Sequence, residues 1–521
     1  MAEHPTVIIG AGIAGLAAAL DLAVAGRPVL VLETADRPGG KIAQAGVGDA
    51  RIDCGPTVFT LKPVFDALFS EAGLDFDAAV KARPATRLAR HVWPGGETLD
   101  LFQEPAASAD AIGRFAGRAE SRGYLRFLDD SRRLFETLDR PFMRRPEPGM
   151  AQMLQGAGLR GMSLLGRVRT MGSMWDALGR YFRDERLRQL FGRYATYCGA
   201  SPFEAPATLM LVAHAEQRGV WLVDGGMQAL ADAVAEAAAS LGAVFRFGTA
   251  AERIECGPGG VRAVVTAEGE RIEAGAAIFN GDIMALKGGR LGPDVAGALT
   301  SDQQAAPSQS AVTLSMTGRV SGLKPDRHTV LFSDHYRAEF DDVFRSGRMP
   351  RNPTIYICAQ DRGDDTPPPD GPERLFFLVN APAGLGGGVP TEAGSWMTAL
   401  LQRAAAYGIQ VSPGSDPPAL ATPASFAARF PATGGALYGR ALHGWQAAFQ
   451  RPGNRTRIPG LYLAGGSIHP GPGVPMAAMS GRHAASCLIA DTPASTPRSR
   501  RAAMPGGMST GSATTERTRS P

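Results

Sequence analysis

Cysteine is scarce in this chain of 521 residues. The five cysteines lie far apart, none of them forms a CxxC pair, and no histidine stands near them at the spacing of metal ligands. A disulfide framework and a zinc site are therefore not expected.

Long apolar runs are missing as well. A helix needs about eighteen uninterrupted apolar residues to cross a bilayer, and no such run occurs; the most apolar stretch covers only residues 13–25. The first predicted strand begins within a few residues of Met1, so we do not expect a cleaved signal peptide. Any association with a membrane should be peripheral.

Lysine is absent from residues 111–195, where arginine is abundant. This segment holds seventeen arginines and nine acidic residues, although the net charge of the whole chain is only +4. So uneven a charge predicts an anionic partner. The Leu, Met, Phe and Trp residues between the arginines favour an anionic membrane surface over nucleic acid, for which the segment has no binding motif. A solvated helical surface without a partner is the alternative.

The composition is otherwise that of a globular protein. Hydrophobic residues make up 44% and charged residues 20% of the chain, which is typical of soluble domains. The chain is too long for one hydrophobic core and suits two or three domains.

A glycine pattern near the N-terminus predicts a dinucleotide site. Residues 6–15 read as a strand, a tight turn and the start of an apolar helix, with glycines at positions 10, 12 and 15. Gly10 permits the turn, Gly12 lets the backbone approach a pyrophosphate, and Gly15 lets the helix pack closely on the sheet. Glu33 ends the second predicted strand, where its carboxylate can accept hydrogen bonds from a ribose and disfavours a 2′-phosphate.

A second glycine pair favours FAD over NAD. Arg37, Gly39, Gly40 and Lys41 follow the acidic strand end directly, and they resemble the flavoprotein pattern in which a basic residue and a glycine turn run along the FAD diphosphate. An ordinary surface turn is the alternative for such a pair. Residues 156–161 have the same glycine spacing as residues 10–15, but no predicted strand precedes them, so we interpret them as a loop.

Two later segments should return to the cofactor. Residues 243–265 alternate like an antiparallel meander, and Val244 is predicted to contact the cofactor there. Residues 458–466 read as a short buried strand stopped by glycines, and a helix is predicted over residues 477–489. The N-terminus of such a helix can stabilise the negative charge of a reduced flavin. The predicted cofactor contacts in this loop are Gly465, Gly466, Pro475 and Met476.

Five motifs together resemble the bacterial phytoene-desaturase-type carotenoid desaturases, over nearly the whole chain up to about residue 490. They are residues 6–15, 37–41, 52–56, 434–439 and 460–475. Within that family, the sequence of residues 466–481 is similar to that of the 1-hydroxycarotenoid 3,4-desaturases of purple photosynthetic bacteria. These include the hydroxyneurosporene and methoxyneurosporene dehydrogenases.

The resemblance implies FAD as the only dinucleotide and an acyclic carotenoid as substrate. The implied reaction introduces the 3,4 double bond into a 1-hydroxy- or 1-methoxycarotenoid such as 1-hydroxyneurosporene, in biosynthesis of the spheroidene and spirilloxanthin type. The resemblance also implies peripheral binding to the cytoplasmic side of the inner membrane. Electrons are expected to leave through FAD to a quinone or to oxygen, and nucleic acid is not an expected partner.

The expected fold is α/β: a Rossmann-like FAD-binding domain of the amine-oxidase and carotenoid-desaturase type, with a discontinuous α+β substrate domain. The FAD-binding domain is predicted over residues 1–74, 216–294 and 436–490. The substrate and membrane-facing domain is predicted over residues 75–215 and 295–435. Residues 491–521 are rich in Ser, Thr, Pro and Arg and read as a disordered tail.

The sequence shows neither a Ser-His-Asp arrangement nor a pair of catalytic carboxylates. Hydride removal next to an extended polyene does not need one, because the resulting cation is delocalised and the protein has only to position the substrate and exclude water. His469 is the candidate base, although local hydrogen bonding or packing beside Pro470 explains a loop histidine equally well. Asp53 and Tyr438 are further candidate lining residues.

Three alternatives stay open. A phytoene desaturase shares the same motifs and would act on an unhydroxylated substrate. An amine-oxidase-like flavoenzyme usually offers its substrate an aromatic cage, whereas residues 434–444 contain one tyrosine and no aromatic pair. A flavin-bound scaffold or carotenoid chaperone without turnover is the non-enzymatic alternative, and the intact phosphate-binding motifs argue against it.

Overall fold

The computed structural model describes residues 4–147, 149–299, 306–363, 369–384 and 387–492. The predicted tail, residues 491–521, lies outside the described residues except for its first two positions.

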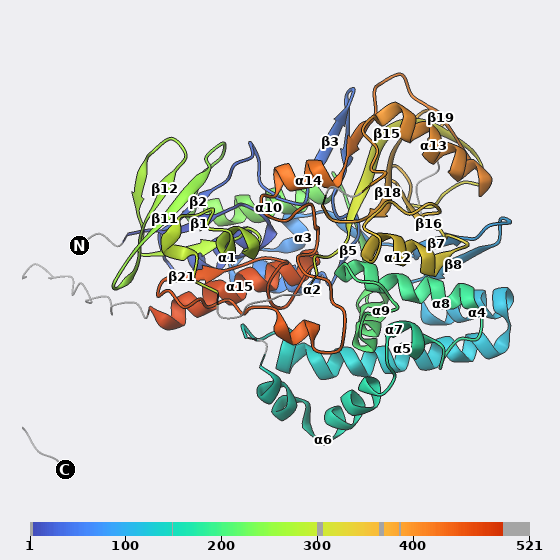
Figure 1. The fold of residues 1–521 in the computed structure, drawn as a ribbon, viewed down its shortest axis with the longest axis horizontal. Coiled ribbons are helices and arrows are strands. Elements are labelled where there is room, and N and C mark those ends of the chain that lie inside the picture. Colours follow the sequence, from blue (N-terminus) through green and yellow to red (C-terminus); the bar gives the residue numbers. More distant parts are fainter. Residues whose placement is uncertain (1–3, 148, 300–305, 364–368, 385–386, 493–521) are drawn as a thin grey trace, which may run out of the picture.

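A parallel sheet forms one half of the molecule, on the left in Figure 1. Its strand order is β10 (Val244–Arg246), β2 (Val29–Leu32), β1 (Thr6–Ile9), β14 (Ala276–Phe279) and β21 (Leu461–Leu463). All neighbouring strands run parallel. Strands β2 and β14 are buried at every position, as expected for a parallel sheet that is covered on both faces.

Two different layers cover this sheet. One layer consists of the helices α1 (Ile13–Val24), α10 (Met227–Ser240) and α15 (Val474–Asp491). The other is the antiparallel meander of β11 (Ala251–Gly257), β12 (Gly260–Thr266) and β13 (Arg271–Glu273). Ile8 and Ile278 pack with the helices, whereas Val7 and Ala277 pack with the meander. Alternate residues of each strand therefore supply two cores.

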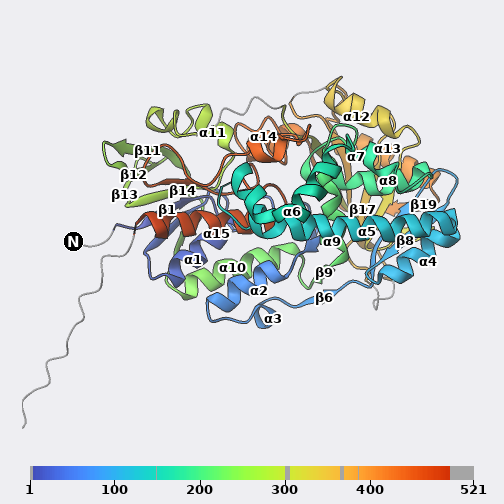
Figure 2. The same cartoon turned by 90° about the horizontal axis from the view of Figure 1, so that it is seen from below.

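Helix α15 packs closely against α1, and the two helices lie side by side in Figures 1 and 2. A Cβ atom on Gly481 would lie 1.9 Å from the carbonyl oxygen of Ala14, so only glycine fits at this crossing. Each helix follows the carboxyl end of a parallel strand. The N-termini of α1 and α15 therefore meet at one edge of the sheet, which is where such folds bind ligands.

A larger sheet forms the other half of the molecule, on the right in Figure 1. Its strand order is β19 (Ile409–Pro413), β15 (Ser310–Gly322), β18 (Glu373–Ala381), β17 (Ile355–Ala359), β16 (His328–Leu331), β7 (Arg87–Val92) and β8 (Thr98–Phe102), and β20 (Ala419–Ala421) pairs with β15. Strands β16 and β7 are parallel, and the other paired strands are antiparallel.

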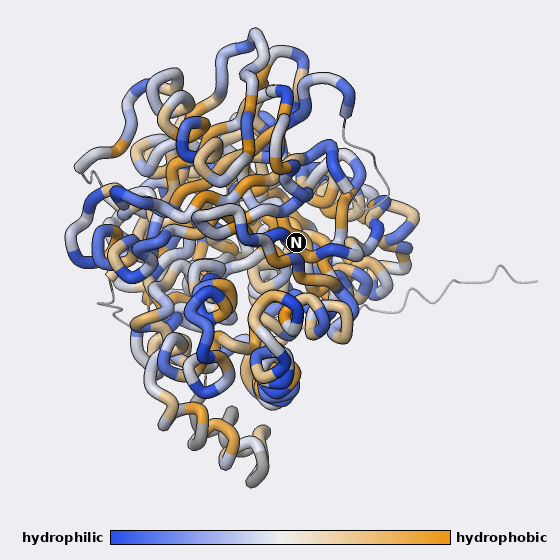
Figure 3. The backbone as a smooth tube through the Cα atoms, turned by 90° about the vertical axis from the view of Figure 1, so that its right-hand side faces the viewer, coloured by the Kyte–Doolittle hydropathy of each residue, from blue (hydrophilic) through white to orange (hydrophobic). Residues whose placement is uncertain are grey.

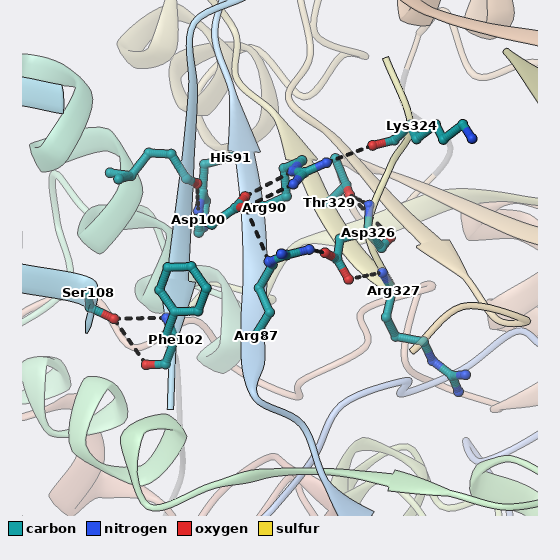
Figure 4. A network of polar contacts seen from close by, with 11 residues as sticks. Arg87, Arg90, His91, Asp100, Phe102, Ser108, Lys324, Asp326, Arg327 and Thr329 are labelled. Atoms are coloured by element: carbon teal, nitrogen blue, oxygen red, sulfur yellow. Dashed lines mark hydrogen bonds and ion pairs between the residues drawn. The ribbon is translucent and has the colours of Figure 1, made fainter. Parts of the chain in front are cut away.

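Ion pairs fasten the β7–β8 hairpin to this sheet, which otherwise comes from residues beyond 309 (Figure 4). Arg90 on β7 binds both carboxylate oxygens of Asp100 on β8, at 2.9 and 2.8 Å. Arg87 bridges Asp100 and Asp326, which lies just before β16. The paired carboxylates neutralise both arginines at this edge.

The two faces of the larger sheet differ in function. On β18, Leu375, Phe377 and Val379 pack under helix α13 (Ala393–Ala406). Phe376 and Leu378, which alternate with them, point to the opposite face and line a cavity.

A layer of helices lies beneath the sheet in Figure 1 and faces the viewer in Figure 2. Its members are α4 (Pro105–Ala116), α5 (Arg118–Leu138), η1 (Asp139–Met143), α6 (Met150–Arg169), α7 (Met174–Leu178), α8 (Glu185–Gly192), η2 (Arg193–Cys198), η3 (Ala207–Met210) and α9 (Leu211–Gln217). Helix α6 projects from the lower edge in Figure 1. It contains residues 156–161, so their interpretation as a loop is wrong; the chain is helical on both sides of a kink at Gly158, where φ is +63°.

The remaining elements are short connections. They are β3 (Gln44–Val47), β4 (Ala50–Asp53), β5 (Phe59–Thr60), α2 (Pro63–Glu71), α3 (Phe76–Ala79), β6 (Ala82–Pro84), β9 (Val220–Val223), α11 (Ile283–Lys287), η4 (Pro293–Val295), α12 (Tyr336–Phe344), α14 (Pro423–Arg429) and η5 (Ala447–Gln450). Hydrophobic segments gather in the interior and hydrophilic ones at the periphery (Figure 3). Within the described ranges, no helix combines the length and the apolar character needed to span a bilayer.

The predicted α/β fold is confirmed. All strands of the parallel sheet come from the three segments predicted for the FAD-binding domain, and all strands of the larger sheet from the two segments predicted for the substrate domain. The exact domain boundaries stay predictions. Two elements differ from expectation: Val244–Arg246 joins the parallel sheet rather than the meander, and the helix predicted over residues 477–489 begins at Val474.

Candidate functional site

A cavity of about 1470 Å³ is lined by elements of both sheets and of the helical layer. One part of its wall is formed by the glycine-rich turns at the carboxyl edge of the parallel sheet, and the other part by mostly apolar side chains of the larger sheet and the helices. Pockets for single small molecules measure roughly 300–1,000 Å³. The cavity therefore has room for a dinucleotide and a long second ligand together.

The first turn has the geometry that its glycines predicted. Gly10 adopts a φ of +103°, which favours glycine. Gly12 lines the cavity directly before the N-terminus of α1, where the first turn of the helix leaves N–H groups free for an anion. A Cβ atom on Gly15 would lie 2.1 Å from the carbonyl oxygen of Gly10, so this glycine allows the close packing of helix and turn.

Glu33 lines the same part of the cavity at the end of β2. Its Oε2 accepts a hydrogen bond from the backbone N–H of Ala11 at 2.6 Å, and its Oε1 accepts one from Ala35 at 2.8 Å. The two amides hold the carboxylate at the cavity wall, in the position that a ribose requires.

The second glycine pair packs onto the first turn. The N–H of Gly39 donates to the carbonyl oxygen of Ala11 at 2.9 Å. A Cβ atom on Gly40, where φ is +61°, would lie 3.0 Å from the Cα of Gly12. Lys41 points into the cavity and donates its amine to the carbonyl oxygen of Leu437, and burial by the surrounding wall lowers its pKa. Gly39, Gly40 and Lys41 thus lie in the wall of the cavity beside the first turn, and their contact with a diphosphate stays a prediction.

Asn280 is a site residue that the sequence analysis missed. It lines the cavity just after β14, and its Nδ2 donates to the carbonyl oxygens of Gly10 and Gly12 at 3.1 and 3.2 Å. The available signal was its position directly after the short apolar run of residues 276–279, because the ends of parallel strands meet at one edge.

The C-terminal loop closes the cofactor part of the cavity. Gly465, Gly466, Pro475 and Met476 all line it, next to the N-terminus of α15. The buried Arg451, which the sequence analysis also missed, donates to the carbonyl oxygen of Gly466 at 3.0 Å and to those of Tyr438 and Arg440 at 3.2 and 3.0 Å. Burial lowers the pKa of Arg451 to about 10. This side chain locks the two loops together.

The prediction of His469 as a base is wrong. The side chain is fully buried and lies outside the residues that line the cavity. Its Nε2–H donates to the carbonyl oxygen of Phe142 at 2.9 Å, and the two rings pack edge to face. Burial lowers the pKa of His469 to about 4, so the ring is neutral near pH 7. The alternative, local hydrogen bonding and packing, describes this histidine.

Two predicted cofactor contacts also lie outside the cavity wall. Val244 stands on the edge strand β10 with 55% of its surface exposed, because the strand belongs to the parallel sheet. Residues 249–252, at the start of the meander, line the cavity in its place. Arg37 turns away to Asp232 on α10, with 3.6 Å between Nη2 and Oδ2.

Of the two further candidate lining residues, only Tyr438 lines the cavity. Asp53 is buried outside the cavity wall, where its Oδ2 accepts from the backbone N–H of Met227 at 2.7 Å, at the N-terminus of α10. Burial raises the pKa of this carboxyl group. Tyr438 does line the cavity, beside the loop that Arg451 holds.

The second part of the cavity is largely apolar and opens near α6. Its wall includes Phe142, Val168, Val330, Phe376, Leu378 and Phe449. Met162 on α6 and Trp445 line the cavity while exposing 43% and 37% of their surfaces. Side chains that face both solvent and cavity mark its mouth.

The first part of the cavity fits FAD. It offers two helix N-termini, a fixed carboxylate at a strand end, and a glycine turn in which a Cβ atom would meet Asn280 or the turn's own backbone. Among the described residues, no group of His, Cys, Asp and Glu side chains could hold a metal ion.

Comparison with known proteins agrees with this geometry. Residues 13–489 match the family model described as flavin containing amine oxidoreductase. The chain is 47% identical to a hydroxyneurosporene desaturase of Rubrivivax gelatinosus, over 98% of both chains. It is 42% identical to the hydroxyneurosporene desaturase of Cereibacter sphaeroides, over 93% of this chain and 97% of that protein.

A solved structure of a putrescine oxidase variant, described as a redesign of its cofactor binding, has a similar fold. The TM-score is 0.58 at 15% sequence identity, over 94% of this chain and 99% of the oxidase. This likeness supports the fold and not the substrate.

Proposed function

Because the chain belongs to the flavin-containing amine oxidoreductase family, we propose from this premise that it is an FAD-dependent carotenoid desaturase. The reaction we propose is the introduction of the 3,4 double bond into an acyclic 1-hydroxycarotenoid, such as 1-hydroxyneurosporene, or its 1-methoxy counterpart. The observation that carries the proposal is the continuity of the cavity, which joins a dinucleotide cradle to a long apolar part.

Bound in the cradle, FAD supplies an acceptor for a hydride and its electron pair. The N-terminus of α15 presents backbone N–H groups to the loop that holds Gly465 and Gly466, and so favours negative charge there. Arg451 keeps that loop in place. The apolar wall orients the polyene and excludes water.

The chain need not supply a strong base for the remaining proton. The acidic residues that line the described cavity are Glu33, Glu252 and Asp282, all in its cofactor part. Loss of a proton from a delocalised polyene cation is easy, so water at the mouth is a sufficient acceptor. The electron acceptor that reoxidises the flavin is a quinone or oxygen in this proposal.

The amine-oxidase alternative is weaker. Among the described residues, the ring contacts do not pair Tyr438 with a second aromatic side chain, and the apolar part of the cavity has no carboxylate in its wall to bind an amine. Phytoene desaturation is the stronger second candidate, because it needs the same cradle and an apolar cavity.

We further propose peripheral binding to the cytoplasmic side of the inner membrane, with the mouth of the cavity facing the lipid. Met162 and Trp445 offer apolar surface there. Arg140, on η1, and Arg145, just after it, are exposed, and η1 packs against α6. Other arginines of the segment pair with carboxylates: Arg132 with Asp129, Arg144 with Asp139, and Arg186 with Asp184. The positive charge that is available for docking is therefore smaller than the number of arginines in residues 111–195 suggests.

The test is to supply FAD-loaded protein in membranes with phytoene, neurosporene and 1-hydroxyneurosporene in separate reactions, and to follow the pigments by chromatography and absorbance. We expect conversion of the hydroxylated substrate. Preferential conversion of phytoene would move the protein to the phytoene-desaturase branch, and conversion of none of the three would favour the amine-oxidase-like or the non-enzymatic alternative.

A further inference from the structure

Three polar residues of the cavity wall carry atoms that are buried within that wall and have no hydrogen-bond partner. They are Arg193, Tyr336 and Gln309, which expose only 8%, 5% and 2% of their surfaces. The atoms without a partner in the described structure are Nε and Nη2 of Arg193, the Tyr336 hydroxyl and Oε1 of Gln309. Buried polar groups are nearly always satisfied, so three of them in one apolar wall indicate a polar ligand group.

Arg193 differs from two other arginines of this domain, Arg362 and Arg90, which pair with carboxylates. Arg362 meets both oxygens of Glu373 at 2.7 and 2.6 Å, and Arg90 meets Asp100 in the same two-pronged way (Figure 4). No carboxylate of the described residues forms an ion pair with Arg193. Its Nε and Nη2 are therefore left without a protein partner.

Arg193 nevertheless stays charged. Its Nη1 donates to the Tyr197 hydroxyl at 2.8 Å, and that hydroxyl donates to Oε2 of the buried Glu216 at 3.4 Å. Burial alone would lower the pKa of Arg193, but the nearby Tyr197 and Glu216 hold it above its ordinary value. A single relay thus satisfies Nη1 of the guanidinium and leaves Nε and Nη2 without a partner inside the wall.

The orientation of Gln309 is fixed by a second relay. The buried carboxylate of Glu339 accepts from Nδ2 of Asn380 at 3.0 Å, so the Oδ1 of Asn380 must accept. Nε2 of Gln309 donates to that oxygen at 3.1 Å and to the carbonyl oxygen of Thr196 at 3.5 Å. The remaining atom, Oε1 of Gln309, is therefore an acceptor.

The three side chains converge on the short helix η2. Arg193 begins η2, and Gln309 binds its residue Thr196. A Cβ atom on Gly192, directly before Arg193, would lie 3.6 Å from the Tyr336 hydroxyl. The cavity wall around η2 thus contains unpaired donors on Arg193 and Tyr336 and an unpaired acceptor on Gln309.

The far end of η2 lies beside the cofactor part of the cavity. A Cβ atom on Gly199, which follows η2, would lie 2.7 Å from the Cβ of Tyr438, whose carbonyl is held by Arg451 next to Gly466. At about 2 Å of rise per residue, η2 spans about 10 Å. The converging polar atoms are therefore about one short helix away from the flavin loop.

We propose that Arg193, Tyr336 and Gln309 form the receptor for the oxygen on C1 of the carotenoid, an inference that rests on the proposed function. The hydroxyl oxygen accepts from Arg193 and Tyr336, and the hydroxyl proton is donated to Oε1 of Gln309. C1 is the next carbon but one to C3, so holding the oxygen at η2 positions the C3–C4 bond toward the flavin loop.

The proposed receptor predicts how kcat/KM ranks among related carotenoids. A 1-hydroxyl group satisfies both donors and acceptor, a 1-methoxyl group leaves Gln309 without a donor, and an unhydroxylated end leaves all three side chains unsatisfied. Unpaired buried groups reject a ligand strongly. The expected order of kcat/KM is therefore 1-hydroxy-, 1-methoxy- and then unsubstituted neurosporene.

The test is a competition between equal amounts of 1-hydroxyneurosporene and neurosporene, in which initial rates report the ratio of kcat/KM. Tyr336→Phe removes only a hydroxyl that has no partner in the protein, and we expect it to lower the preference for the hydroxylated substrate about five- to tenfold. Arg193→Met, combined with Glu216→Gln so that no buried charge is left alone, should lower it further. Arg193→Lys, which keeps a donor, should retain part of it. The rate on neurosporene should rise, because the variants remove polar groups that this substrate leaves unpaired.

Tyr407→Phe is the matched control. Tyr407 lies outside the cavity wall and donates its hydroxyl to the carbonyl oxygen of Phe332 at 2.6 Å, so its variant loses a real protein hydrogen bond. We expect an unchanged substrate preference.

Two outcomes overturn the receptor: an unchanged preference in Tyr336→Phe and in the Arg193/Glu216 variant, or an equal loss on both substrates. If the unsubstituted protein converts neither carotenoid, the proposed function fails first. In that case we would measure how much of each carotenoid the desalted protein retains. The proposed receptor predicts that the wild type retains more of the hydroxylated pigment than Tyr336→Phe does. Equal retention would contradict the proposal.

Discussion

At the scale of single residues, the polar side chains around the cofactor part act mostly on the backbone. Glu33 accepts from Ala11, Asp53 accepts from Met227, and Arg451 donates to Gly466. Each of them satisfies a main-chain group that a turn would otherwise leave unpaired. The site is therefore shaped by residues that hold loops rather than by residues that react.

His469 belongs to this class, and its titration can be tested. The folded-state pKa is about 4 against an ordinary value of 6.5. Between these values the unfolded chain binds a proton that the folded chain does not bind, so stability is lost as the pH falls through that window. The contribution at pH 7 over that at pH 4 is about 3 kcal/mol.

We expect His469→Gln to weaken this pH dependence, because glutamine can donate to the Phe142 carbonyl without titrating. The measurement is Tm between pH 7 and pH 4 for both proteins, together with turnover per bound flavin. Turnover should stay within about twofold of wild type, since the side chain does not reach the cavity. A loss above about tenfold at unchanged flavin content would make His469 a catalytic residue after all.

At the scale of elements, the crossing of α1 and α15 organises the cofactor part. The two helices begin at different glycine loops, far apart in the sequence, and their contact at Gly481 brings those loops together. The position of the second loop thus depends on a helix packing contact rather than on the loop itself.

Gly481→Val should therefore disturb flavin binding from a distance. Its side chain would collide with the backbone of Ala14, and we expect a loss of about 2 kcal/mol or more in the free energy of unfolding, with a lower flavin content after desalting. Ser486→Val is the control, because it places the same β-branched side chain on the exposed face of α15. Equal effects of the two substitutions would mean that the crossing does not position the loop.

At the scale of the whole molecule, the mouth of the cavity and the exposed arginines lie on the same side as α6, which projects at the lower edge of Figure 1. A water-insoluble polyene must enter without crossing water. A mouth that rests on lipid meets this requirement.

Co-sedimentation with liposomes tests the docking surface. We expect binding to anionic vesicles at low salt, and weaker binding at high salt or to neutral vesicles. Replacing both Arg140 and Arg145 by Gln should weaken binding about ten- to thirtyfold, at about 1 kcal/mol per basic residue. The control replaces the exposed Arg51 and Arg262 in the same way, which removes equal charge from other elements. Equal binding to both vesicle types, or equal loss in both variants, would exclude this surface.

The cradle was largely predictable from the sequence. The glycines at positions 10, 12 and 15 act through local turn geometry, and a local pattern is enough to identify them. Asn280 binds Gly10 across 270 positions of the chain, and no spacing rule connects the two. Val244 was misplaced because a short alternating strand fits an edge of a parallel sheet as well as a meander.

By itself, the sequence determined the class of cofactor, the α/β fold and the absence of a long apolar span, since these depend on short-range turn geometry, hydrophobic periodicity and composition. Only the tertiary structure decided which polar residues line the cavity. Arg193 and His469 are both buried residues in irregular segments, yet packing turns Arg193 into the cavity and His469 against Phe142. The reason is physical: the direction of a buried side chain is set by the partners that the fold brings to it, and those partners come from distant parts of the chain.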